Sequence, residues 1–112
     1  MVETNNILAI LDNYLHDNPD EIAKEIAADF RRRRIEKNLT REQVAEKSGG
    51  AVSNIVRFEQ KGLISLKNLI SIAMALEYTS EIRLIFSQQK YSTMEEQQEI
   101  KRNMNKKKAY RR

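Results

Sequence analysis

The sequence predicts an all-α protein, and three observations support this prediction. Glycine and proline are scarce, with three and one in 112 residues, so the chain lacks the punctuation that strands and hairpins need. Residue types that favour helices, such as Leu, Ile, Ala, Glu and Lys, dominate the composition. Apolar residues also recur at helical spacing along most of the chain.

Local signals place the ends of the expected helices. Thr40 and Gln43 match a capping box at a helix start. In this motif the side chain of each residue accepts a hydrogen bond from the backbone N–H of the other. Asn38 tolerates the left-handed conformation that ends many helices, and the adjacent Gly49 and Gly50 permit a sharp change of direction. The expected helices cover, approximately, residues 4–16, 20–37, 40–48, 51–60, 65–76, 79–86 and 93–105.

These helices divide the chain into three parts. Residues 1–19 form an N-terminal helical extension, residues 20–87 a compact domain, and residues 88–112 a basic tail that is partly helical or disordered. Thr93 and Glu96 form a second capping box in the tail, and residues 106–112 are expected to be disordered in isolation. The first helix either docks on the domain or seats a partner protein through four apolar residues, Ile7, Leu8, Leu11 and Leu15.

Composition argues against several classes of function. There is no cysteine and only one histidine, His16, so we expect no disulfide, no metal site and no cofactor. We find no plausible nucleophile–base pair and no phosphate-binding loop, so we expect neither an enzyme nor a small-molecule substrate. No run of about 18 apolar residues occurs, and the N-terminus lacks the pattern of a signal peptide. We therefore expect a cytoplasmic protein without a membrane segment.

Charge is distributed unevenly along the chain, whose net charge is +4. Residues 1–29 hold seven acidic residues and one basic residue. Residues 30–87 hold eleven basic and six acidic residues, and residues 88–112 hold eight basic and three acidic residues. A basic middle and end favour a nucleic-acid partner, although a basic tail alone is often only solvated.

Residues 40–60 carry the pattern of a helix-turn-helix, with two short helices joined by a turn that contains glycine. In such a unit the second helix enters the major groove of DNA, where each base pair shows its own donor and acceptor pattern. Ile55 and Phe58 are expected to face inward at a spacing of three residues. The outward positions of this helix are left to Val52, Ser53, Asn54 and Arg57.

Residues 22–87 resemble the XRE family, the five-helix, lambda-repressor-like domains of phage repressors and Cro proteins. The arginine that ends the first helix of the domain, the segment LTREQVAEKSG and the segment IVRFEQKG carry the resemblance together. Residues 51–86 are most similar to the HipB-like antitoxins, through NIVRFEQKGLISLKNLISIAMAL. That resemblance implies a HipA-like kinase toxin as a possible partner. The sequence departs from the family at Gly50 and at Ala51, where Ser or Thr often caps the reading helix, so this cap is expected to be weak.

The resemblance and the motif assign roles to individual residues. Arg57 and Asn54 are the best candidates for base contacts, because Arg pairs with guanine and Asn with adenine. Ser53 is a third candidate, and Val52 either meets a thymine methyl group or merely packs. We assign Arg41, Lys61 and Lys67 to DNA phosphates, with ordinary surface charge as the alternative.

Two further sets have structural roles. The resemblance implies an inner ion pair between Arg34 and Glu59. Residues Ile82, Ile85 and Phe86 give the last helix of the domain more apolar surface than one small domain needs, which favours a homodimer interface. The alternative is packing in the core, which we expect to take Leu84 or Phe86. Of Arg31, Arg32 and Arg33, which span almost a full turn, one or two are expected to be solvated.

These residues predict a homodimeric transcriptional repressor that binds an inverted repeat in double-stranded DNA. Binding in its own promoter and the antitoxin role beside a HipA-like kinase follow from the resemblance alone. The alternative is a protein-interaction module that sequesters a toxin without reading DNA, and the polar outer face of the reading helix argues against it.

Overall fold

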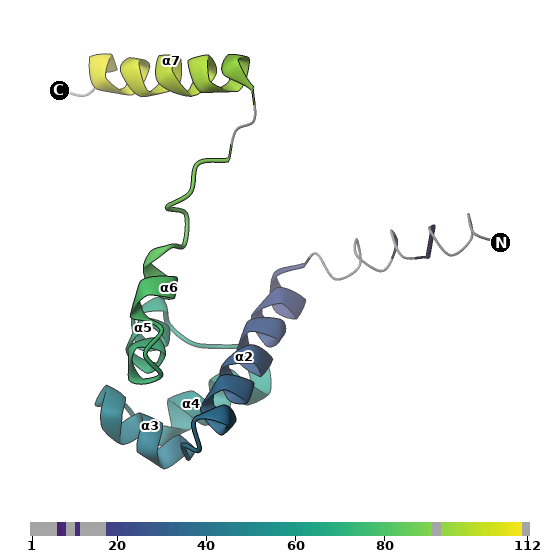
Figure 1. The fold of residues 1–112 in the computed structure, drawn as a ribbon, viewed down its shortest axis with the longest axis vertical. Helices are drawn as coiled ribbons and strands as arrows, with labels where there is room; N and C mark the ends of the chain where they lie inside the picture. Colours follow the sequence, from purple (N-terminus) through teal and green to yellow (C-terminus); the bar gives the residue numbers. More distant parts are fainter. Residues whose placement is uncertain (1–6, 9–10, 12–17, 91–92, 111–112) are drawn as a thin grey trace. The chain divides into compact units, whose positions relative to one another are not determined.

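The computed structural model describes residues 7–8, 11, 18–90 and 93–110, and the regular structure among them is entirely helical (Figure 1). The chain divides into two units, residues 1–82 and 83–112, and each is described here by itself. The helix expected over residues 4–16 lies mostly outside the described residues. Ile7, Leu8 and Leu11 are described, and they are helical and exposed.

Helix α2, Pro19–Glu36, begins at a strong local signal. The side chain of Asn18 accepts a hydrogen bond of 2.8 Å from the Glu21 N–H, and Pro19 occupies the first helical position, where its missing N–H costs nothing. Asn18 and Pro19 therefore start this helix, one residue before the predicted start at Asp20. Asn38 adopts a positive φ of 55° just beyond the helix, as predicted from its tolerance of that conformation.

Helix α3, Arg41–Ser48, carries the predicted capping box. The Gln43 N–H donates to the Thr40 hydroxyl at 3.0 Å, and the Thr40 N–H donates to the Gln43 side chain at 2.8 Å. The helix ends at Gly49, whose φ of 72° lies in the left-handed region that glycine adopts without strain. Local chemistry thus sets both ends of α3, and the turn between the two helices of the motif begins at Gly49.

Helix α4, Val52–Lys61, starts without a side-chain cap, as expected from Ala51. It ends at Gly62, which has a φ of 70°. A Cβ atom at this position would lie 3.0 Å from the Ala23 carbonyl carbon and 3.1 Å from the Lys24 nitrogen. Glycine is therefore required here twice, by backbone conformation and by the close approach of the chain to α2.

Two more helices follow α4 along the chain. Ser65 caps α5, Leu66–Ala75, by accepting the Asn68 N–H at 3.1 Å. Helix α6, Thr79–Arg83, ends three residues before the predicted end at Phe86. Phe86 itself has a positive φ of 63°, a conformation that does not continue a helix.

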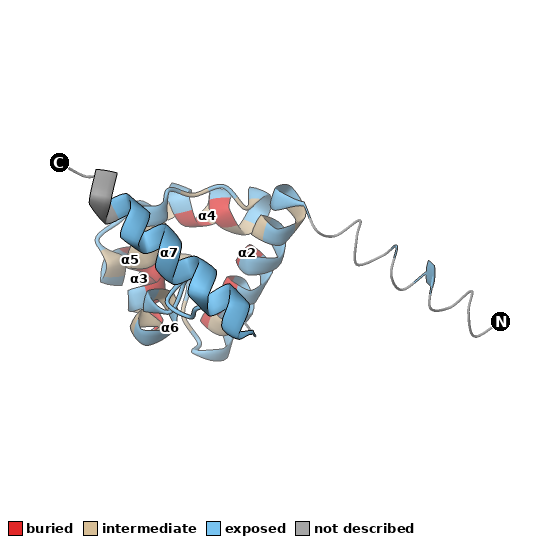
Figure 2. Ribbon diagram, turned by 90° about the horizontal axis from the view of Figure 1, so that it is seen from above, coloured by how far each residue is buried: buried red, intermediate tan, exposed pale blue. Residues whose placement is uncertain are grey.

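The core lies where α2, α3, α4 and α5 meet, and Figure 2 shows the buried residues on their facing sides. Phe30 of α2 and Phe58 of α4 contact edge to face, with ring centroids 5.5 Å apart and an interplanar angle of 60°. Ile22 and Ile26 have the helical spacing of an apolar stripe with Phe30, but they are exposed, because α2 meets the core only through its C-terminal half. The core residues are Ala27, Phe30, Val44, Ala45, Ile55, Phe58, Ile72 and Leu76.

The second unit contains α7, Met94–Tyr110. Thr93 caps it by accepting the Glu96 N–H at 3.1 Å, which confirms that half of the second capping box. The helix runs through residues 106–110, so the expected disorder is wrong for these residues. Lysine has good helix propensity, and positive charge at a helix C-terminus interacts favourably with the helix dipole.

Candidate nucleic-acid interface

The two sides of α4 differ sharply in burial. Ile55 and Phe58 are fully buried in the core, whereas Ser53, Asn54 and Arg57 are exposed. The spacing of three between Ile55 and Phe58 fixes this division, because such residues lie on one face of a helix. Helix α4 therefore presents a row of polar side chains to solvent on a rigid support.

Val52 differs from its three polar neighbours on α4. It is half-buried and packs against the core cluster while part of its side chain stays accessible. Val52 thus packs in part, which was one of its two predicted roles. Its contact with a thymine methyl group remains a prediction.

Asn54 lies where α4 faces the start of α5. Asn54 and Arg57 line a hollow of about 220 Å³ together with Asn68. Asn54 and Lys67 line a second hollow of about 240 Å³. The structure therefore places two predicted base contacts and one predicted phosphate contact on a continuous surface. Lys61 is exposed at the last position of α4 and lines neither hollow.

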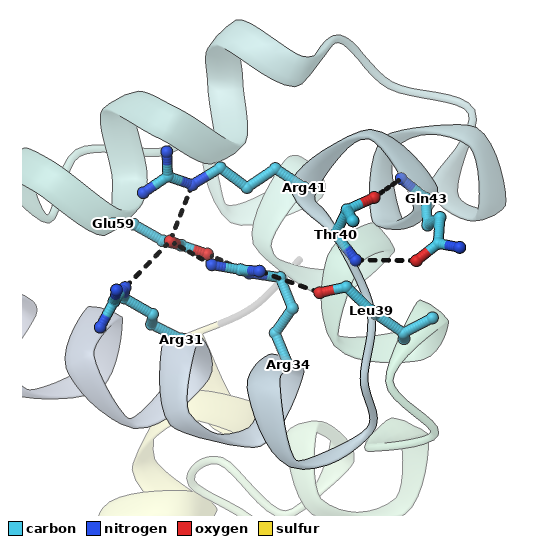
Figure 3. A network of polar contacts seen from close by, with 7 residues as sticks. All are labelled: Arg31, Arg34, Leu39, Thr40, Arg41, Gln43 and Glu59. Atoms are coloured by element: carbon cyan, nitrogen blue, oxygen red, sulfur yellow. Dashed lines mark hydrogen bonds and ion pairs between the residues drawn. The ribbon is translucent and has the colours of Figure 1, made fainter.

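Arg34 and Glu59 form the predicted ion pair, in a two-pronged geometry (Figure 3). Arg34 Nε donates to Glu59 Oε2 at 2.7 Å and Nη2 donates to Oε1 at 3.0 Å. Its Nη1 donates to the backbone oxygen of Leu39 at 2.9 Å. Only 1% of the Glu59 side chain and 10% of the Arg34 side chain are exposed. The pair ties α2 to α4 and to the loop before α3.

Two more arginines reach the same carboxylate, as Figure 3 shows. Arg41 Nε donates to Glu59 Oε1 at 3.0 Å, and Arg31 Nε lies 3.9 Å from that oxygen. Sequence reasoning placed Arg41 at phosphates and gave Arg31 no specific role. The signal for Arg31 was its spacing of three from Arg34, which puts both on one helix face. No local pattern connects Arg41 to Glu59, 18 residues later.

The environment of Glu59 alters its acidity. Burial disfavours the charged carboxylate, but the hydrogen bonds and positive charges of Arg34 and Arg41 outweigh burial and hold the pKa of Glu59 below its usual value. The carboxylate therefore stays ionised at neutral pH and keeps its three arginine partners. Arg32 and Arg33 instead pair with Asp29 and Glu36 on the outer surface of α2.

The predicted dimer residues lie at the end of α6 and just beyond it. Ile82 is half-buried, Ile85 is exposed and Phe86 is 100% exposed. Leu84 is exposed as well, so the expectation that the core takes Leu84 or Phe86 is wrong for the single chain. The physical reason is that α6 ends at Arg83 and Phe86 adopts a positive φ of 63°, so the helix expected to carry both side chains does not continue.

No group of three or more His, Cys, Asp or Glu side chains in the described ranges is placed to hold a metal ion. Within the same ranges, no helix is both long enough and apolar enough to span a membrane.

Helices α3 and α4, the Gly49 turn between them and the flanking α2 and α5 define a helix-turn-helix domain of the lambda-repressor-like class. A family model described as Helix-turn-helix matches residues 30–82, slightly less than half of the chain. The match covers the end of α2, all of α3, α4 and α5, and most of α6. It supports the resemblance to XRE proteins at the level of the helix-turn-helix domain. No curated protein matches the chain.

Proposed function

We propose that this protein is a sequence-specific DNA-binding transcriptional repressor whose α4 enters the major groove. The observation that carries the proposal is the division of α4 between a buried apolar face and an exposed face bearing Ser53, Asn54 and Arg57. An α-helix fits the major groove, where Arg and Asn side chains pair with guanine and adenine. The match of residues 30–82 to a helix-turn-helix family supports this docking mode.

In this proposal, base and phosphate contacts have separate tasks. Val52, Ser53, Asn54 and Arg57 contact base edges, and Arg57 carries the largest share of specificity. Arg41, Lys61 and Lys67 contact phosphates, which fix the position of the domain on DNA without reading sequence. Lys67 is well suited to this task, because it lines the same hollow as Asn54.

The proposed active form is a homodimer that binds an inverted repeat, with Ile82, Ile85 and Phe86 at the interface. The exposure of Ile85 and Phe86 leaves apolar surface that a second copy would bury. A two-fold dimer presents two reading helices, which suits half-sites about one helical turn apart. Regulation of its own promoter and partnership with a HipA-like kinase toxin rest on the sequence resemblance, and the proposed cytoplasmic location rests on the sequence pattern.

The test is fluorescence anisotropy on DNA from upstream of the protein's own gene and on a scrambled duplex, at about 0.15 M salt. Specific sites typically bind about a thousandfold or more tighter than nonspecific DNA, so a preference of at least about a hundredfold supports the proposal. Equal and weak binding to both duplexes would contradict it. Co-purification with a neighbouring gene product, without DNA affinity, would favour the toxin-sequestering alternative.

Arg57→Ala and Arg32→Ala form a matched pair for this assay. Both remove one exposed positive charge, but Arg32 lies on α2 and pairs with Asp29 rather than facing outward from α4. Arg57→Ala should reduce the preference for the upstream fragment by about 1–3 kcal/mol. Arg32→Ala should leave the preference unchanged.

A further inference from the structure

Arg31 and Arg41 are held by Glu59 in a way that leaves part of each guanidinium unused. All three guanidinium nitrogens of Arg34 donate hydrogen bonds within the chain, two to Glu59 and one to Leu39. Arg31 and Arg41 turn only Nε toward Glu59, and both approach the same oxygen, Oε1. Among the described residues, their terminal nitrogens have no acceptor. Each guanidinium therefore retains donors for a ligand from outside the chain.

These donors border a hollow of about 430 Å³ that lies between the end of α2 and the start of α3. Arg31, Arg34, Thr40, Arg41 and Glu42 line it. The capping box occupies the N–H groups of Thr40 and Gln43, but those of Arg41 and Glu42 have no acceptor within the described ranges. Unpaired amides at the start of a helix add favourable dipoles for an anion beside the two guanidiniums.

The charge balance at this hollow is positive. Three guanidiniums surround one buried carboxylate, which leaves two positive charges, and exposed Glu42 at the rim lowers the balance to one. Glu59 also keeps Arg31 and Arg41 close together despite their mutual repulsion. Two long side chains that are already ordered lose less entropy when they bind a ligand.

We propose that Arg31 and Arg41 together bind one backbone phosphate of DNA, and that Glu59 between them positions both side chains. This inference rests on the proposed DNA-binding function and adds to it a contact residue, Arg31, and a positioning residue, Glu59. Arginine suits the task, because its planar fork donates two parallel hydrogen bonds to phosphate oxygens. Since Glu59 belongs to α4, a phosphate bound here fixes the backbone of DNA relative to the helix that reads bases.

The test measures how the affinity for duplex DNA depends on salt, using the upstream fragment and a scrambled duplex with full-length protein. The slope of log affinity against log salt falls by about 0.9 for each phosphate contact that is lost. If Arg31 and Arg41 share one phosphate, the double variant Arg31→Gln/Arg41→Gln should lower the slope by about 1 in total. The loss should be the same on both duplexes, because a phosphate contact carries no sequence information.

The matched control is Arg32→Gln/Arg33→Gln, which removes the same charge from adjacent positions of α2 whose partners are Asp29 and Glu36. It should leave the slope unchanged. Arg31→Gln alone is a second test that does not endanger the fold, because the Arg31 side chain is 57% exposed, like that of Arg32. The salt slope of Arg31→Gln should be shallower than that of Arg32→Gln. Thermal unfolding should show that both variants fold.

Three results would overturn the inference. A double variant that behaves like its control would show that no phosphate is bound, and a loss of about 2 in slope would indicate two separate phosphates. An equal fall in duplex affinity in the wild-type protein and the double variant, when phosphate replaces chloride at equal ionic strength, would show that phosphate does not bind in this hollow. If the wild-type protein shows no preference for the upstream fragment, the repressor proposal fails. The salt slopes measured on the scrambled duplex still decide whether Arg31 and Arg41 share a phosphate.

Discussion

Arg34 and Glu59 are 25 residues apart in the chain and are joined by two parallel hydrogen bonds of 2.7 and 3.0 Å. Their side chains are almost completely buried, and the Leu39 carbonyl occupies a third donor of Arg34. Three segments of the domain therefore depend on one charged pair: α2, the loop before α3, and α4. A buried pair of this kind is costly to break, because either partner left alone is an uncompensated charge.

Glu59→Ala should destabilise the domain by about 3–5 kcal/mol, because it strands the buried guanidinium of Arg34. Urea denaturation followed by circular dichroism measures the free energy of unfolding. Glu36→Ala is the control, since Glu36 pairs with Arg33 on the exposed surface of α2 and should contribute about 1 kcal/mol or less. Equal stability of the two variants would contradict the structural role of the inner pair.

Acidification should weaken the domain through Glu59. Its pKa is lowered in the folded state, so the stability that it contributes is fully present above its unfolded value, about 4.3. That stability is lost as pH falls through the lower, folded pKa. Urea denaturation between about pH 6 and pH 3 should show this loss, and Glu59→Gln should have a shallower pH dependence in the same window. A parallel pH dependence in both proteins would contradict the prediction.

Gly62→Ala should destabilise the domain by more than about 1 kcal/mol, because the residue has a positive φ and a Cβ would press on the backbone of α2. Gly50→Ala is the control. Its Cβ would meet only the Ser48 hydroxyl at 3.5 Å, an ordinary contact, and its φ is not positive. Thermal unfolding should therefore show a clear loss for the first variant and almost none for the second.

Phe86→Gly should weaken self-association without harming the single chain. The side chain is fully exposed and makes no core contact, and glycine adopts the positive φ at this position more readily than phenylalanine. Sedimentation at tens of micromolar should therefore shift from dimer toward monomer. Ile35→Gln is the control, because Ile35 on α2 is 51% exposed, the same as Ile85. Sedimentation of the wild-type protein as a monomer at the same concentration would contradict the proposed dimer interface.

Local signals predicted much of the fold from the residues alone. The Thr40 and Gln43 capping box, the left-handed positions at Asn38 and Gly49, and the inward pair of α4 were all confirmed. Each of these features depends on residues within about four positions of one another, where helical geometry alone decides which groups meet.

Other features depend on packing between distant segments. Ile22 and Ile26 have the spacing of a core stripe, yet they are exposed because α2 extends beyond the elements that cover it. The core was expected to take Leu84 or Phe86, but α6 ends at Arg83 and both side chains are exposed. An apolar residue is buried only if another element lies opposite it, and sequence spacing does not say where that element ends.

The sequence by itself therefore determined the helix-turn-helix and the polar outer face of α4, whereas the partnership of Arg34 with Glu59 was implied by the family resemblance. Only the tertiary structure brought Arg31 and Arg41 to the same carboxylate, from two other helices. The physical reason is that one buried charge attracts every cation that the fold places within reach, and that reach is set by how α2, α3 and α4 pack together.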